Sequence, residues 1–332
     1  MRKHGARLLA ALAVSLLFVW GGDAHAGGVI KLGVVTKPGS AQNVCAEKFK
    51  ELVESRSDYE VKIFHSASLG TETEILQQIQ MNSVQMGVIT SGPFDVFVPE
   101  ARVIDYPFLF ANSAEADQVL DGPAGQALLK ALERARFKGL AYSENGFRHL
   151  TNNVRPVHTV DDVKGLKIRV MESILHKELW RVLGANPTPM GWPIYTELQQ
   201  GTIDAQENPL WVIWNYKLFE VQKYMSLTGH VYSAHIDVAS LDWFNGLPAK
   251  DQDMIVQAMK EAAAYQRKWN RDNEADFLAK AKAAGMIVNE APDLASFRAK
   301  AAVLKDLDIY KDPKVQDMLT LFLDAVAKIR GK

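Results

Sequence analysis

The chain has only one cysteine, Cys45, among its 332 residues, so it cannot form an internal disulfide bond. A chain of this length buries enough surface to fold without one. Cys45 lies among apolar residues at helical spacing, with Val44, Phe49 and Leu52 around it. We therefore interpret it as a small buried core residue, and a reactive thiol is the alternative.

Long hydrophobic runs are absent except near the N-terminus. Three basic residues within the first seven positions precede an apolar segment, 8–20, and Ala24-His25-Ala26 follows with small residues at the positions that a signal peptidase reads. This order predicts a signal peptide over residues 1–26, and the apolar segment is too short for a stable membrane anchor. We expect an exported, periplasmic protein without membrane insertion.

An excess of positive charge is also lacking. The whole chain carries 38 Lys and Arg against 39 Asp and Glu. Without residues 1–26 these numbers become 35 and 38, which gives a net charge of −3. Nucleic acids and anionic membranes are bound by basic patches, so neither is expected as a partner.

Catalytic and metal-binding signatures are missing too. The sequence contains no nucleophile elbow, no HExxH and no Cys/His pair with a plausible third member. His230, His235 and Asp237 lie near one another, but their spacing matches no zinc or iron signature. We expect no metal, no cofactor and no enzymatic activity. An exported hydrolase is the alternative.

What the sequence does contain is a repeated order of strands and helices. Strands are predicted over 29–35, 59–65 and 84–89, separated by helices, and the opening βαβαβ order indicates an α/β lobe with a largely parallel sheet. A second series begins at Gly139–Ser143 and continues through strands at 166–171 and 202–205. From Ala249 the chain is almost entirely helical, including a long amphipathic segment over 252–284. At this length two lobes are expected rather than one core.

Arg169 lies on a short strand whose other face is apolar. Leu166, Ile168 and Val170 alternate with Lys167, Arg169 and Met171, a period of two that places Arg169 opposite the buried face. A guanidinium group binds a carboxylate with two parallel hydrogen bonds. The pattern alone favours the alternative, a solvated surface arginine.

Several segments together resemble the extracytoplasmic solute-binding subunits of tripartite ATP-independent periplasmic (TRAP) transporters, of the dicarboxylate-binding DctP type. They span nearly the whole chain after residue 26 in the order of that family. The segments are Ser68-Leu69-Gly70, Tyr106–Phe110, Glu144–Asn152, Gly165–Val170, Gly184–Pro187, Asp204–Pro209 and Phe219–Tyr224.

The resemblance implies two α/β lobes, a type II-like periplasmic binding protein, with a long helix that spans both. We expect the first lobe to comprise residues 27–146 and about 235–273. The second lobe is expected to comprise 147–234 and about 274–332, including C-terminal bracing helices. The resemblance also implies an organic-acid ligand and two membrane subunits, one small and one large, as partners. A sensor that presents its ligand to a membrane receptor is the other alternative, and a monomer is the default oligomeric state.

The same resemblance assigns roles to individual residues. Arg169 matches the arginine that forms a two-pronged salt bridge with the ligand carboxylate. Arg148 matches a second cation, and Asn208 a hydrogen-bond donor near the same carboxylate. Glu72 matches a polar residue that meets ligand hydroxyls or an amine. Trp192 stands where many members have phenylalanine.

Glu172 stands where many members have asparagine, and with Trp192 it leaves C4-dicarboxylates, sugar acids, hydroxy acids and keto acids open as ligands. Four further candidates line the predicted cleft on weaker grounds. Ser91 and Phe94 follow a strand end, where ligands often bind, although Phe94 also fits the core. Trp211 follows the QENP motif, Gln206–Pro209, with core packing as the alternative. His235 is the fourth of these ligand-binding candidates.

Overall fold

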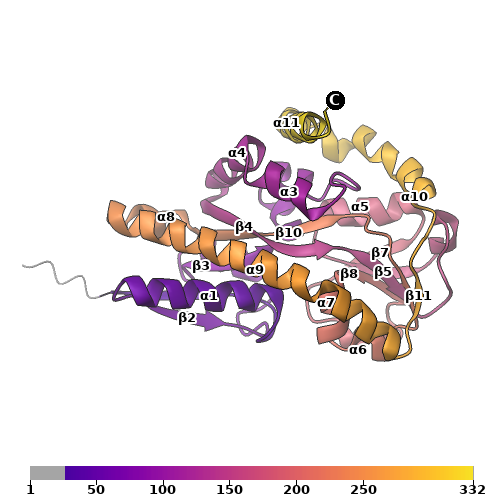
Figure 1. The fold of residues 1–332 in the computed structure, drawn as a ribbon. Helices are drawn as coiled ribbons and strands as arrows, with labels where there is room; N and C mark the ends of the chain where they lie inside the picture. The colour runs from indigo at the N-terminus through magenta and orange to yellow at the C-terminus, as the bar shows by residue number, and fades with distance from the viewer. Residues whose placement is uncertain (1–26, 332) are drawn as a thin grey trace, which may run out of the picture.

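The computed structural model describes residues 27–331 of the chain, and the predicted signal peptide lies outside this range. Within it the chain forms two β-sheets flanked by helices, and the long helix α9 (Ala249–Ala283) runs along both (Figure 1). We refer to the five-stranded sheet with the helices around it as the first lobe. The six-stranded sheet with its helices is the second lobe.

The first sheet has the strand order β2-β1-β3-β10-β4. β1 pairs in parallel with β2 and β3, whereas β10 is antiparallel to both β3 and β4. The strands are β1 (Val29–Gly33), β2 (Glu60–Phe64), β3 (Met86–Thr90), β4 (Phe137–Phe147) and β10 (Tyr232–Ser240). The sheet is therefore mixed rather than largely parallel, because the chain returns to it as β10 after it has built most of the second sheet.

The second sheet has the order β11-β9-β5-β8-β6-β7. β6 pairs in parallel with β7 and β8, and β5 is antiparallel to β8 and β9. The strands are β5 (His149–Asn152), β6 (Lys167–Val170), β7 (Asn186–Pro189), β8 (Ala205–Asn208), β9 (Tyr224–Ser226) and β11 (Ile287–Asn289).

Two strand predictions need correction. Gly139–Ser143 was expected to open the second series, but it lies in β4, which pairs with β10 in the first sheet. The strand expected at 202–205 lies further along, as β8. Helix α6 is followed by Gly201, which adopts a positive φ of 69°. The residues after Gly201 form a turn, so strand pairing begins only at Ala205.

Helices cover both sheets. In the first lobe they are α1 (Ala41–Arg56), α2 (Glu72–Gln80), α3 (Ser113–Leu120), α4 (Pro123–Ala131) and α8 (Leu241–Asn245), with short 3₁₀ turns η1 (Gly92–Val96) and η2 (Pro99–Val103). In the second lobe they are α5 (Ile174–Leu183), α6 (Tyr195–Gln199) and α7 (Leu210–Asn215). The chain closes with α10 (Leu294–Ala301) and α11 (Pro313–Ile329).

Helix α9 joins the lobes through one long apolar stripe. Ile255, Met259 and Ala262 share an apolar cluster with β1 of the first lobe. Farther along, Phe277 and Ala281 belong to a cluster with second-lobe residues such as Trp211. These positions recur every three or four residues, the spacing of one helix face. The expectation of a long helix lying across both lobes is confirmed.

The C-terminal helices divide their contacts between the lobes. α10 packs on α5 of the second lobe, whereas α11 packs on η2, α3 and α4 of the first. Figure 1 shows α11 at the edge of the molecule beside α3 and α4. The predicted domain boundaries stay a prediction, and these contacts indicate that the C-terminal segment braces both lobes.

Candidate ligand-binding site

A pocket lies between the two lobes, with about 370 Å³ of space free of protein atoms. Both lobes contribute charged and polar side chains, and aromatic rings close the second-lobe side. The lining residues are Val35, Thr36, Gln42, Glu72, Thr90, Asn145, Arg148, Arg169, Met171, Trp192, Asn208, Trp211, Val212, Tyr216 and His235.

Arg169 is buried in this pocket, with 4% of its surface exposed. The alternative of a solvated surface arginine is therefore wrong. Its Nε donates to the carbonyl oxygen of Met190 at 2.8 Å, and its guanidinium carbon lies 5.8 Å from the ring centre of Trp192. Within residues 27–331 it forms no salt bridge. Burial, together with the charge of Arg148, lowers the pKa of Arg169 to about 10.

Arg148 lines the same pocket, but its charge is balanced. Its Nε donates to Oε2 of Glu207 at 2.5 Å and its Nη2 to Oε1 at 2.8 Å, in a fully buried ion pair. Burial alone would raise the pKa of Glu207. The charge of Arg148, the nearby His176 ring and the hydrogen bond with His230 instead hold that pKa well below its usual range. No described residue accepts a hydrogen bond from Nη1 of Arg148.

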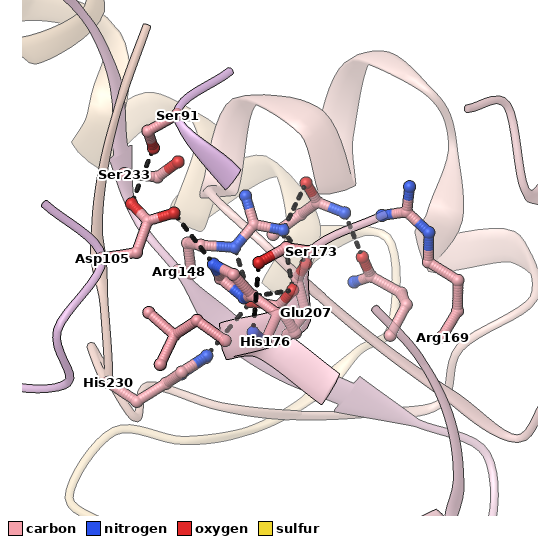
Figure 2. A network of polar contacts seen from close by, with 12 residues as sticks. Ser91, Asp105, Arg148, Arg169, Ser173, His176, Glu207, His230 and Ser233 are labelled. Atoms are coloured by element: carbon pink, nitrogen blue, oxygen red, sulfur yellow. Dashed lines mark hydrogen bonds and ion pairs between the residues drawn. The ribbon is translucent and has the colours of Figure 1, made fainter. Parts of the chain in front are cut away.

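The ion pair belongs to a larger polar network that crosses from one lobe to the other (Figure 2). His176 on α5 contacts Glu207 at 3.6 Å and Asp105 of the first lobe at 3.1 Å, and Ser91 Oγ donates to Asp105 at 2.6 Å. Burial would lower the pKa of His176, but the hydrogen bond to Asp105 and the nearby negative charge of Glu207 raise it to about 9. His176 is therefore a buried cation between two carboxylates.

Glu72 supplies a carboxylate to the first-lobe side of the pocket. Its Oε1 accepts hydrogen bonds from Gln42 Nε2 at 2.6 Å and from both the backbone N and Oγ1 of Thr90 at 2.8 Å. Burial nevertheless raises its pKa. These donors all bind one oxygen, which leaves the other free to accept from a ligand.

Three more predicted residues lie at the pocket. Asn208 accepts from Arg148 Nη2 at 3.3 Å and donates to Gln206 at 2.5 Å. Trp211 donates its Nε1 to the carbonyl oxygen of Asn145 at 2.8 Å, so its ring orientation is fixed. His235 is 1% exposed, and its Nε2 has no partner among the described residues.

Three predicted residues do not line the pocket. Phe94 is fully buried and packs edge-to-face on Phe137, with ring centres 5.7 Å apart, which matches the core alternative. The Ser91 hydroxyl donates its hydrogen bond to Asp105. Glu172 accepts a hydrogen bond from Thr73 at 3.2 Å, a contact between the second lobe and α2 of the first.

No local sequence pattern pointed to the remaining lining residues. Gln42, Thr90 and Tyr216 come from three elements far apart in the chain, and only the fold brings them together. The network partners of Arg148 were missed for the same reason. Glu207 stands beside Asn208 in the QENP motif, which was the one available clue.

Comparison with known proteins identifies the family. The model for bacterial extracellular solute-binding protein, family 7 (DctP) matches residues 32–310. The chain belongs to this family. The predicted resemblance to TRAP solute-binding subunits and the two-lobed α/β fold are confirmed.

Solute-binding relatives match over most of their length. A solute-binding protein of Verminephrobacter eiseniae is 40% identical over 276 residues, 82% of each chain. The 2,3-diketo-L-gulonate-binding periplasmic protein YiaO of Escherichia coli is 35% identical over 313 residues, 93% of this chain and 95% of that one.

Solved structures of the family resemble this one closely. A TRAP periplasmic solute-binding protein from Polaromonas sp. JS666, bound to D-erythronate, has a TM-score of 0.85 at 37% identity and covers 89% of this chain and 98% of its own. A sugar acid binding protein from Advenella mimigardefordensis, in complex with galactonate, has a TM-score of 0.85 at 34% identity and covers 90% and 98%. Across residues 27–331, none of the helices in this family member is both long and apolar enough to cross a bilayer.

Proposed function

We propose that this family member is the periplasmic subunit of a TRAP transporter and binds a hydroxylated monocarboxylate of the sugar-acid type. The observation that carries the proposal is the buried Arg169, which lines the pocket and has no ionic partner among the described residues. An arginine removed from water needs an anion and hydrogen-bond acceptors to replace its hydration. A ligand carboxylate meets this need with two parallel hydrogen bonds.

The opposite side of the pocket favours hydroxyl groups over a second carboxylate. The Glu72 carboxylate faces that side, and a second ligand carboxylate there would be repelled. Hydroxyl groups can donate to Glu72 and accept from Arg148 Nη1. The acids bound by the solved relatives, D-erythronate and galactonate, have this composition.

The proposed role needs only capture and release, so it requires no chemical change of the ligand. Closure of two lobes around an anion excludes water and strengthens the Arg169 ion pair. The closed form then differs in surface shape from the open form, which allows the two membrane subunits to recognise the loaded protein. We propose periplasmic capture followed by delivery to those subunits.

Calorimetric titration with D-galactonate, D-erythronate, D-galacturonate, D-glucuronate and succinate tests the ligand class. We expect at least one sugar acid to bind more tightly than succinate. Arg169→Ala should weaken binding at least about a hundredfold, because the ligand carboxylate would be buried without its partner. Arg169→Lys should also weaken it, since an ammonium group cannot form the two-pronged pair.

Arg181→Ala is the matched control, because Arg181 lies exposed on α5 and its one ion pair in the described part of the chain is with Glu178 on the same helix. It should bind as the unaltered protein does. Unchanged affinity in Arg169→Ala, or tighter binding of succinate than of every sugar acid, contradicts the proposal. Uptake of the bound acid by cells with and without this chain, in the presence of the two membrane subunits, tests delivery.

A further inference from the structure

A line of buried polar side chains leads from the pocket into the first lobe. His235 and Asp237 are two residues apart on β10 and therefore point to the same face of the sheet. Ser143 on β4 lies directly opposite His235 in the antiparallel register. All three are at most 1% exposed, so no bulk water intervenes between them.

Hydrogen bonds connect the three side chains in series. Ser143 Oγ lies 3.4 Å from His235 Nδ1 and 2.9 Å from Asp237 Oδ1. His235 Nε2, the other ring nitrogen, has no partner within residues 27–331, and His235 lines the pocket. One end of the series is therefore available to a ligand, and the other end is a buried carboxyl group.

The Ser143 hydroxyl has one proton to donate, so the direction of its hydrogen bond with Asp237 determines the direction of its hydrogen bond with His235. When Asp237 is ionised, Ser143 donates to it and accepts from His235 Nδ1–H, so His235 Nε2 carries a lone pair. When Asp237 is protonated, it donates to Ser143, and Ser143 donates to His235 Nδ1. His235 Nε2 then carries the proton.

The groups around this series leave Asp237 as the one that titrates near neutral pH. Burial raises the pKa of Asp237 to about 8, opposed by Ser143 and by the charge of Arg267 on α9. Burial, with Arg148, lowers the pKa of His235 to about 3, so the ring is neutral. Burial also raises the pKa of the neighbouring Cys45 thiol on α1 well above its usual range, so the thiol is neutral too.

We propose that His235 determines ligand specificity in the pocket, and that Ser143 and Asp237 are positioning residues that set whether its Nε2 donates or accepts. The proposal rests on the proposed function for its ligand, an organic acid. At pH 7 the series presents an N–H donor to a ligand oxygen. Above pH 8 it presents an acceptor, which a carbonyl oxygen cannot satisfy and a hydroxyl group can.

Nitrogen-15 NMR of the imidazole rings tests the switch without any ligand. The His235 signal is assigned by its loss in His235→Gln. We expect the proton on Nε2 at pH 6.5 and on Nδ1 at pH 9.5, with a midpoint near 8. Asp237→Asn and Ser143→Ala should each remove the change with pH, and Asp293→Asn, an exposed helix cap, should keep it. One tautomer at every pH, or a switch that persists in Ser143→Ala, overturns the proposal.

Titration with D-galactonate tests the specificity role separately. His235→Ala should weaken binding about tenfold, the loss of one buried hydrogen bond. Unchanged affinity would contradict a role in specificity. If D-galactonate does not bind the unaltered protein, the proposed ligand class is in question, while the NMR result still decides the switch. Thermal unfolding of each variant shows that the loss is not a failure to fold.

Discussion

The two pocket arginines differ in how their charge is balanced. Arg148 is paired with Glu207 and keeps Nη1 without a partner among the described residues, whereas Arg169 forms no salt bridge there and bonds through its Nε to a backbone carbonyl beside the Trp192 ring. Breaking a buried ion pair costs stability, because one charge is left without a partner. Arg148 therefore contributes to stability as well as to the pocket, and Arg169 is the residue whose charge is available to a ligand.

His176 makes the folded state sensitive to pH at the scale of a single residue. Its pKa is raised to about 9, above the usual 6.5, so its protonation stabilises the fold in full below pH 6.5, and this contribution is lost as pH rises to 9. The expected difference is on the order of 3 kcal/mol in the free energy of unfolding. Denaturant unfolding of the unaltered protein and of His176→Gln between pH 6 and 9.5 measures it.

The advantage of the unaltered protein over His176→Gln should shrink across that pH range. His65→Gln is the control, because His65 is exposed and its ring bonds, among residues 27–331, only to Ser66. Its stability should follow that of the unaltered protein at every pH. A constant difference between the unaltered protein and His176→Gln would show that His176 is neutral in the folded state.

Helix α5 begins at a carboxyl group from the other lobe. Asp95 of η1 accepts hydrogen bonds from the backbone N of Ile174 at 3.1 Å and of Leu175 at 2.9 Å, and from Ser173 Oγ at 2.9 Å. Both carboxylate oxygens of Asp95 therefore accept hydrogen bonds. The first turn of a helix leaves N–H groups that need such acceptors. Asp95 thus couples the start of α5 to the first lobe.

Asp95→Asn should destabilise the protein by about 2 kcal/mol, because an amide NH₂ would face buried N–H or O–H donors. Asp293→Asn is the matched control, since a single oxygen of Asp293 accepts both capping bonds of α10 and asparagine retains it. That variant should lose less than about 0.5 kcal/mol. Denaturant unfolding at pH 7 measures both, and equal losses would contradict the account of Asp95.

The sequence predicted most elements because hydrophobic spacing and breakers act locally. Gly184, with a φ of 104°, ends α5, and α9 follows its apolar stripe. The burial of β10 could not be predicted from local spacing. Its alternation of Ser233, His235 and Asp237 with apolar residues is typical of a half-exposed strand, yet both faces are buried. The polar face is covered by elements distant in sequence, which local pattern does not reveal.

Contacts across the mouth of the pocket hold the two lobes together at the scale of the molecule. The backbone N of Lys37 in the first lobe donates to Tyr216 Oη in the second at 2.8 Å, and Thr73 donates to Glu172. The pocket therefore has its geometry only when the lobes are closed. Arg169 and Asn208 could be assigned from the local motifs that carry them, whereas Gln42, Thr90 and Tyr216 reach the pocket only through the fold and the closure of the lobes.

Gly191 marks where closure leaves no room for a side chain. A Cβ atom there would lie 2.5 Å from Thr71 Cγ2 of the other lobe and 3.3 Å from Glu172 Oε2. Gly191→Val should therefore hold the lobes apart and shift the population to the open form. We expect a larger radius of gyration in X-ray scattering with D-galactonate present. Binding of D-galactonate should weaken at least about tenfold. Gly28→Val, at an uncrowded site, should change neither. Because opening relieves the contact, the thermal stability of Gly191→Val should stay near that of the unaltered protein. An unchanged scattering profile together with unchanged affinity would contradict this prediction, because it would mean that the closed lobes tolerate the side chain.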